Sequence, residues 1–387
     1  MSIPPLPSSF PSSSRRLDLP GFRLGHGSDR AGMTGVTVIL CPEGVMAAAE
    51  VRGTATGTRQ FDSLVAGQHI ASRAHAVVLA GGSAFGLSAA DPVVDWLAAR
   101  GYGFQTGVSP VPLVPTAILF DLGFGDPGAR PVPALVEQAL ASASEGEVET
   151  GSVGAGTGAT VGKVLGRDNA MKGGFGFVSL AVPDGITVAA AVAVNAFGDV
   201  RGLDGRIVAG CRTAPDSKEL AEADRVLANL PPETPHPWEG NTTLAVVMTD
   251  AILSKATALK VCQMAFGGFY RTLVPALSMV DGDLIVTLST GQRRAHVHQV
   301  GVLAERAIAE AILVAVREAD GFGGAAGGPG SDSVTPCLST RAAVLTAILN
   351  VGEGLAPSRV GEATERVIAS PQPLPSREGA SPSPTYC

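Results

Sequence analysis

The chain has 387 residues, of which 45% are hydrophobic and 16% charged, which excludes a disordered acidic protein and provides a core for one or two globular units. Its 28 Lys and Arg against 35 Asp and Glu give a net charge of -7, so we expect no nucleic-acid partner. Five widely spaced cysteines without a C-x-x-C pair favour a reducing, cytoplasmic compartment. Because no apolar run fits a signal peptide or a membrane span, we expect neither export nor a membrane partner.

Both ends of the chain have a composition typical of disorder. Residues 1–16 and 369–387 are rich in Pro and Ser and contain too few apolar side chains to offset the entropy lost on ordering. We therefore expect a single folded domain over residues 17–368.

The first half of this domain alternates short apolar runs with glycine-rich turns. Residues 35–44 and 75–82 are predicted strands, and residues 88–101 are a predicted helix that Gly101 ends. Residues 176–200 contain two β-rich runs joined by Pro-Asp-Gly, the composition of an antiparallel hairpin. These patterns predict a mixed α/β fold.

The second half begins after a polar segment. Residues 217–230 have helical spacing, and residues 230–240, LPPETPHPWEG, contain four prolines and are expected to form an extended, exposed linker. A strand over 242–251, a helix over 254–273, a strand over 281–291 and a helix over 298–319 follow. The hydrophobic strand thus starts directly at the end of the linker.

A hydroxyl residue, Thr242, stands on this boundary. If the Asn241–Thr242 bond were broken, Thr242 would carry both its Oγ1 and a free α-amine, whose ordinary pKa is about 7.7 to 8.0. Such an amine is partly unprotonated at neutral pH and is able to act as general base for the adjacent hydroxyl. The alternatives are an ordinary first strand residue and an N-x-[ST] glycosylation site, which requires export.

Two further patterns have both a structural and a chemical interpretation. Asn195 ends a run of apolar and β-branched residues, so its amide is either a satisfied core group or a donor to a ligand. Asp281 and Asp283 flank Gly282 before a strand and point the same way if strand geometry holds there, but an ordinary Asp-Gly-Asp turn has the same pattern.

Two possible ligand sites fail on their spacing. GAGTGATVGK, residues 154–163, lacks the preceding strand and following helix of a dinucleotide fingerprint, and it fails the phosphate-loop pattern. His296 and His298 alternate along the chain without the cluster of further ligands that a metal requires. We therefore expect neither a metal nor an organic cofactor.

Several longer segments together resemble one family, the Ntn-type hydrolases of peptidase family S58. This family includes the DmpA-type L-aminopeptidase/D-esterases, the β-peptidyl aminopeptidases and the nylon-oligomer hydrolases. The similarity runs in the family's order over roughly residues 21–354. The matching segments are GTRQFD (57–62), LAGGSAFGLSAAD (79–91), VPTAILFDL (114–122), GSVGAGTGATVGK (151–163), GGFG (173–176), VAVNAFGDV (192–200), GNTTLAVVMTDA (240–251) and DGDLIVTLSTG (281–291).

The resemblance implies a four-layer α-β-β-α sandwich and self-cleavage into an α chain, residues 1–241, and a β chain, residues 242–387. It makes Thr242 the nucleophile and Asn241 the residue before the cut. The implied activity is that of an aminopeptidase or amidase that hydrolyses small peptides or amides through an acyl-enzyme. An oligomer of αβ heterodimers is also expected.

The remaining site residues are carried over from the family position by position. Asn195 matches the side-chain amide that holds the developing oxyanion, and Lys163 matches a basic residue that lines the site. Asp281 and Asp283 match the polar or acidic pair that faces the nucleophile. Phe120 departs from the family, because some members have an aromatic hydroxyl near this position. Two other functions remain open: an acyltransferase of related architecture, and an uncleaved, non-catalytic scaffold.

Overall fold

The computed structural model describes residues 10–234 and 240–321. The predicted disorder of residues 1–9 and 369–387, and the middle of the predicted linker, lie outside these ranges. The strands are β1 (Ser13–Ser14), β2 (Arg16–Leu17), β3 (Arg23–Asp29), β4 (Thr34–Val51), β5 (Thr58–Arg59), β6 (Arg73–Ala80), β7 (Phe104–Gln105), β8 (Pro110–Val111), β9 (Thr116–Ile118), β10 (Gly146–Glu147), β11 (Thr160–Val161), β12 (Met171–Lys172), β13 (Gly174–Ala181), β14 (Thr187–Asn195), β15 (Asp199–Arg201), β16 (Ile207–Ala209), β17 (Thr242–Ala251), β18 (Leu273–Val274) and β19 (Leu284–Arg293). The helices are α1 (Asp62–Val65), α2 (Ala90–Ala98), α3 (Pro133–Ser142), α4 (Ala223–Ala228), α5 (Lys255–Thr272) and α6 (Val297–Glu318), with 3₁₀ turns η1 (Ser83–Ala89), η2 (Gly154–Gly156) and η3 (Arg167–Asn169).

Strand β4 connects two halves of a large mixed sheet. Within the described residues, ten strands form this sheet in the order β1-β13-β14-β17-β19-β4-β6-β9-β5, with β3 also paired to β4. The first part of β4 pairs with β3 and β6, its last part pairs with β19, and the β6 register shifts between Leu40 and Val45. An irregularity of this kind bends a strand. The sheet therefore folds over into two layers at residues 41–45.

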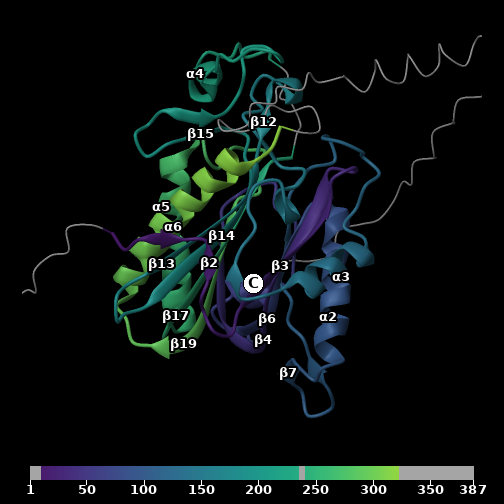
Figure 1. Ribbon diagram of the computed structural model, residues 1–387, viewed down its shortest axis with the longest axis vertical. Coiled ribbons are helices and arrows are strands. Elements are labelled where there is room, and N and C mark those ends of the chain that lie inside the picture. Colours follow the sequence, from purple (N-terminus) through teal and green to yellow (C-terminus); the bar gives the residue numbers. More distant parts are fainter. Residues whose placement is uncertain (1–9, 235–239, 322–387) are drawn as a thin grey trace, which may run out of the picture. The chain divides into compact units, whose positions relative to one another are not determined.

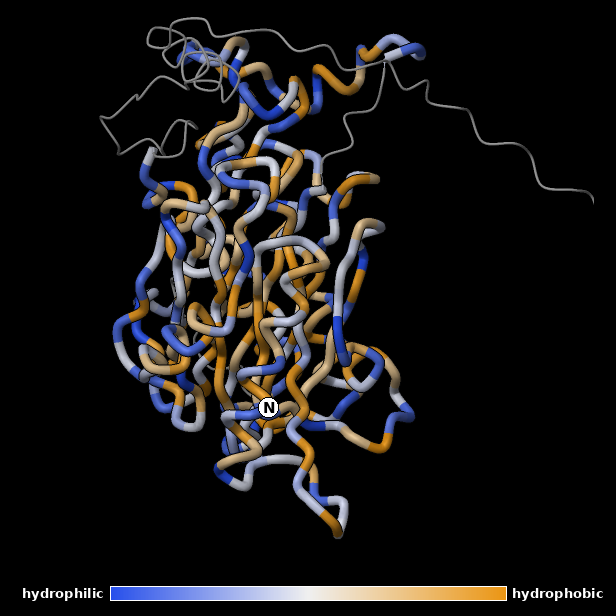
Figure 2. Tube along the Cα trace, turned by 90° about the vertical axis from the view of Figure 1, so that its right-hand side faces the viewer, coloured by the Kyte–Doolittle hydropathy of each residue, from blue (hydrophilic) through white to orange (hydrophobic). Residues whose placement is uncertain are grey.

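Three apolar clusters separate four layers. The inner faces of both sheet layers meet in a core that includes Phe175, Leu244 and Val77. The opposite face of β13, β14 and β17 packs on α5 and α6, and the opposite face of β4 and β6 packs on α2 and α3. Figure 1 shows the two helix pairs on opposite sides of the strands, and the trace in Figure 2 is most hydrophobic along those strands. The predicted α-β-β-α sandwich is confirmed.

Most predicted elements are present, with changed bounds. The hairpin is β13 and β14, paired antiparallel, and β17 covers the predicted residues 242–251. The predicted helix over 88–101 becomes η1 followed by α2, and the helix over 217–230 is reduced to α4. In the latter case, the first residues pair with an earlier segment instead, through an antiparallel bridge between Arg212 and Leu220 and the bond from Ala221 N–H to Cys211 O at 2.7 Å.

Residues 10–16 differ from the predicted disordered N-terminus. Ser13 and Ser14 form β1, which pairs antiparallel with Ser179 and Leu180 of β13. Edge pairing supplies backbone hydrogen bonds and needs no apolar side chain, so composition alone does not reveal it. None of the helices within the described ranges combines the length and apolar character needed to cross a lipid bilayer.

Candidate functional site

Thr242 is the first residue of β17, a strand in the middle of the sheet. Antiparallel pairing with β14 places Asn195 directly opposite Thr242. On the other side, β17 runs parallel to β19, and an isolated bridge joins Asn241 to Asp281 just before these strands begin. The sheet register therefore brings together Asn195, Thr242 and the segment just before β19, although they are far apart in the sequence.

Lys163 ties the residues around the Asn241–Thr242 bond to one another. Its Nζ donates hydrogen bonds to the backbone oxygen of Asn195 at 3.0 Å, to Asn195 Oδ1 at 2.9 Å and to Asn241 Oδ1 at 2.7 Å. Asn195 Oδ1 also accepts from Thr160 N–H at 3.0 Å. All three side chains are buried, so these charge-assisted bonds are shielded from water.

The carbonyl oxygen of Asn241 receives two donors. The Gly282 N–H donates to it at 2.8 Å, and the Thr242 Oγ1 hydroxyl also donates to it. Gly282 was not among the predicted site residues. The sequence feature that could have indicated its role is its position between Asp281 and Asp283, just before β19. The Thr242 hydroxyl and the carbonyl of the preceding peptide bond are therefore in direct contact.

Asp281 and Asp283 hold the loop that contains Gly282. Asp281 accepts from Phe197 N–H at 3.2 Å and from the Ser278 hydroxyl at 2.5 Å, while Asp283 accepts from Thr243 N–H at 2.6 Å. Burial raises the pKa of both carboxyl groups above the ordinary range, and the negative charge of Asp281 raises the pKa of Asp283 further. Asp283 thus bonds to the backbone of the residue after Thr242, whereas Asp281 bonds to Phe197 and Ser278.

A small apolar cluster fixes the backbone from which these polar groups project. It contains Val164, Phe197, Cys211 and Ala223, with Val280 packed against it. Val164 follows Lys163, Phe197 lies two residues after Asn195, and Val280 precedes Asp281 in the sequence. The site is therefore supported by packing that couples its separate segments.

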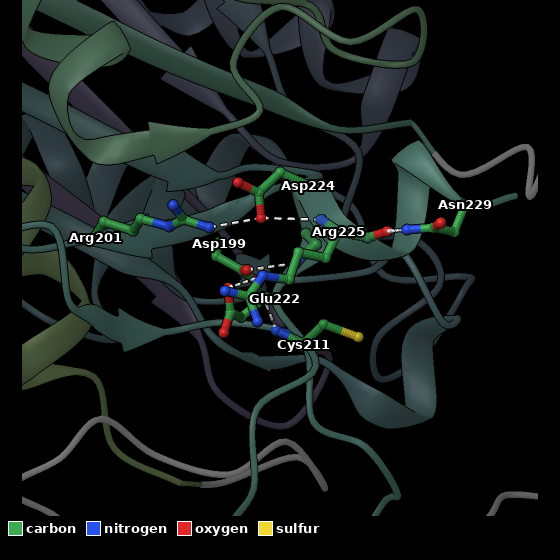
Figure 3. A network of polar contacts seen from close by, with 8 residues as sticks. Asp199, Arg201, Cys211, Glu222, Asp224, Arg225 and Asn229 are labelled. Atoms are coloured by element: carbon green, nitrogen blue, oxygen red, sulfur yellow. Dashed lines mark hydrogen bonds and ion pairs between the residues drawn. The ribbon is translucent and has the colours of Figure 1, made fainter.

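A polar network anchors the segment that leads to the linker. Asp199 of β15 is fully buried, and its carboxylate accepts from Cys211 N–H at 2.8 Å and from Ala223 N–H at 2.7 Å. Arg201 forms an ion pair with Asp224 of α4 at 2.6 Å, as Figure 3 shows. Because α4 ends only thirteen residues before Asn241, this network holds the chain close to the linker.

A small cavity adjoins the site on the linker side. Its lining combines aromatic, basic and acidic residues beside Gly240: Phe120, Phe124, Lys163, Arg167 and Asp121. Phe120 also accepts a hydrogen bond from Asn195 Nδ2 through its backbone oxygen, at 3.0 Å. The side chain of Phe120, the position at which some family members have an aromatic hydroxyl, packs on Gly240. A Cβ added to Gly240 would lie 2.7 Å from Phe120 Cβ and 2.9 Å from Phe120 Cγ.

The start of the glycine-rich segment 154–163 is a structural turn. Residues 154–156 form the buried turn η2, whose backbone bonds to Ser28 and Thr37. Among the residues that the structure describes, no three His, Cys, Asp or Glu side chains gather in a way suited to a metal ion, and this includes His296 and His298.

Comparisons with known proteins agree with this geometry. The profile of peptidase family S58 matches residues 16–328. An uncharacterized aminopeptidase of Mycobacterium leprae is 36% identical over 347 residues, which are 79% of this chain and 91% of the relative. A 6-aminohexanoate-oligomer endohydrolase of a Kocuria species is 30% identical over 281 residues, 72% of this chain and 75% of that protein.

Two solved structures share the fold at lower sequence identity. A β-aminopeptidase of a Burkholderia species has a TM-score of 0.60 at 21% identity, with 90% of this chain and 97% of the other covered. An L-aminopeptidase D-Ala-esterase/amidase of Ochrobactrum anthropi, described as a variant of the Ntn hydrolase fold, has a TM-score of 0.60 at 20% identity, with coverage of 87% and 94%.

Proposed function

Because the chain belongs to peptidase family S58, the Ntn-type hydrolases of peptide and amide bonds, we propose that it matures by cutting its own backbone between Asn241 and Thr242. The observation that carries this proposal is the contact between the Thr242 hydroxyl and the Asn241 carbonyl, at the buried start of a central strand. The Pro-rich linker ends at this contact, so a cut there separates two chains that remain packed in one sheet.

The proposed cut is an N-to-O acyl shift. Thr242 Oγ1 attacks the Asn241 carbonyl carbon, and the carbonyl electron pair moves onto its oxygen. The hydroxyl proton passes to the Thr242 nitrogen as the C–N bond breaks, which leaves an ester and a free amine. Water then hydrolyses the ester, so Asn241 keeps the carboxylate and Thr242 regains its hydroxyl.

The same hydroxyl then acts on substrates. The free amine of Thr242 has an ordinary pKa of about 7.7 to 8.0, which lets it accept the hydroxyl proton at neutral pH. The hydroxyl attacks a substrate carbonyl, the leaving amine departs, and water releases the acyl group. Asn195 Nδ2, which donates to Phe120 O in the uncut chain, is the proposed side-chain donor to the substrate oxyanion.

Lys163, Asp281 and Asp283 are proposed to position these groups. Lys163 orients Asn195 through one hydrogen bond of 2.9 Å to its side-chain Oδ1 and one of 3.0 Å to its backbone oxygen. The carboxyl groups of Asp281 and Asp283 hold the backbone at Phe197 and at Thr243, respectively.

The substrate is proposed to be a small peptide or a linear amide oligomer. Relatives of this chain are named as aminopeptidases and as 6-aminohexanoate-oligomer endohydrolases, and these names support the proposed substrate class. We propose further that the enzyme acts in the cytoplasm, as an oligomer of αβ heterodimers.

A pair of isosteric variants tests the nucleophile. Thr242→Val removes the hydroxyl and should leave one chain of 39.0 kDa without hydrolase activity. Thr243→Val is the matched control, because the buried Thr243 Oγ1 has no hydrogen-bond partner among the residues that the structure describes. This variant should still yield two chains. Cleavage of Thr242→Val at the normal rate would overturn the proposal.

The two other functions give different results in the same assay. A scaffold predicts a single chain for the unmodified protein. An acyltransferase predicts two chains and a product that forms only when an amine acceptor is supplied.

A further inference from the structure

We propose that the backbone N–H of Gly282 is the oxyanion donor for self-cleavage, and that Asn195 serves substrate hydrolysis instead. The inference rests on the proposed self-cleavage and assigns the groups that stabilise its transition state. A backbone donor then stabilises the oxyanion of self-cleavage, and a side-chain donor stabilises the oxyanion of substrate hydrolysis.

The contacts of the uncut chain separate these two donors. The Gly282 N–H donates to the Asn241 carbonyl oxygen at 2.8 Å, and negative charge develops on this oxygen when Thr242 Oγ1 attacks. The Asn195 Nδ2 donor is bonded to Phe120 O at 3.0 Å. The backbone amide is therefore already aligned on the atom that becomes the oxyanion.

Gly282 is also held rigidly, as an oxyanion donor must be. Its neighbours form backbone bonds to the facing segment: Ala55 N–H donates to Asp281 O at 3.0 Å, and Gly53 N–H donates to Asp283 O at 2.9 Å. The side chains of Asp281 and Asp283 are bonded as described above, and Gly282 itself is buried. The donor therefore needs little reorganisation when charge develops on the carbonyl oxygen.

Space for the nucleophile explains why this position is a glycine. The φ angle of Gly282 does not lie in the left-handed region, so its backbone conformation suits any residue. A Cβ on Gly282 would, however, lie 2.7 Å from Thr242 Oγ1 and 2.7 Å from the backbone oxygen of Ala55. The absence of a side chain lets the amide approach the carbonyl while the hydroxyl keeps its place.

In the acyl shift, the Oγ1–C bond forms as the carbonyl electron pair moves to oxygen, and the Gly282 N–H stabilises that charge through its existing hydrogen bond. The proton of the hydroxyl leaves with the Thr242 nitrogen when the C–N bond breaks. Gly282 gains and loses no proton in this step, so its contribution is electrostatic.

Replacement of one backbone atom tests this role without adding bulk. Cell-free translation with glycolic acid at position 282 changes the amide N–H of the full chain to an ester oxygen. The matched control carries glycolic acid at Gly81, a buried glycine whose N–H donates to Gly35 O at the same 2.8 Å. Loss of one oxyanion donor typically slows a reaction by about 100- to 1,000-fold. We expect this loss for the ester at 282 and a change of less than about threefold for the control.

The outcomes separate the two proposals. If the unmodified chain does not cut itself, the proposed function fails. If it does, and the 282 ester cuts as fast as the control ester, the role of Gly282 is wrong. Thermal unfolding of both ester proteins checks that they fold.

A second measurement does not depend on the ester. Amide hydrogen exchange of ¹⁵N-glycine-labelled Thr242→Val protein should show a protected Gly282 N–H, assigned by its loss in a Gly282→Ala variant. Exchange as fast as that of an exposed amide would overturn the proposal.

Discussion

Gly282→Ala is the substitution whose effect follows most directly from the geometry of the site. The added methyl group would lie 2.7 Å from Thr242 Oγ1, whereas ordinary van der Waals contact begins at 3.4 Å, so the hydroxyl must retreat by roughly 0.7 Å. The loop has little room to move away, because the backbone oxygen of Ala55 lies at the same 2.7 Å. A misplacement of about 1 Å costs on the order of 100-fold in rate. Self-cleavage of Gly282→Ala should therefore be about 30- to 100-fold slower than that of the unmodified chain.

The assay is a time course of newly translated chain on a denaturing gel. Gly67→Ala is the control, since a Cβ at Gly67 meets no atom within 4 Å and its φ is not in the left-handed region. This control should cut at the normal rate. Equal rates for Gly282→Ala and Gly67→Ala would refute the claim that the nucleophile lies against this glycine.

Two further predictions concern charged groups. Lys163→Met removes the three hydrogen bonds that hold Asn195 and Asn241, each worth about 1.5 to 3 kcal/mol, so both the melting temperature and the rate of self-cleavage should fall. The control is Lys255→Met, which removes hydrogen bonds of 2.7 and 2.6 Å to the carbonyl oxygens of Ala47 and Ser63 and should lower the melting temperature alone. A normal rate of self-cleavage in Lys163→Met would contradict the role given to Lys163. Because burial raises the pKa of Asp283, the folded chain retains a proton that the unfolded chain loses near pH 4, so stability falls as the pH rises from there toward the raised pKa. Denaturant titrations of Thr242→Val protein at about pH 4 and about pH 7 measure how much the free energy of unfolding falls between these pH values. This fall should be smaller when Asp283→Asn is added, and equal falls would contradict the assigned pKa direction.

The resemblance to a known family predicted the layers of the fold, and local composition predicted the boundary at which β17 begins. The abrupt change from a Pro-rich linker to an apolar run defines Thr242 as the first strand residue, and the structure places β17 over residues 242–251. The resemblance to peptidase family S58 is confirmed by a match over residues 16–328. These features depend on local composition and on long segments, which a sequence displays directly.

The contacts of the site depend on register, which local composition does not determine. Asn195 lies opposite Thr242 because β14 pairs with β17 in one particular alignment, and a shift by one residue would turn its amide to the other face. Gly282 reaches the Asn241 carbonyl only because β19 runs parallel beside β17. The bend in β4 likewise results from pairing with different neighbours at its two ends.

N-terminal sequencing and intact mass of the purified, active protein test the central claim most directly. We predict two chains, the second beginning Thr-Thr-Leu at residue 242, with hydrolase activity present only where that new terminus is found. Active protein that consists of one continuous chain, or whose second chain begins at another residue, would contradict the account.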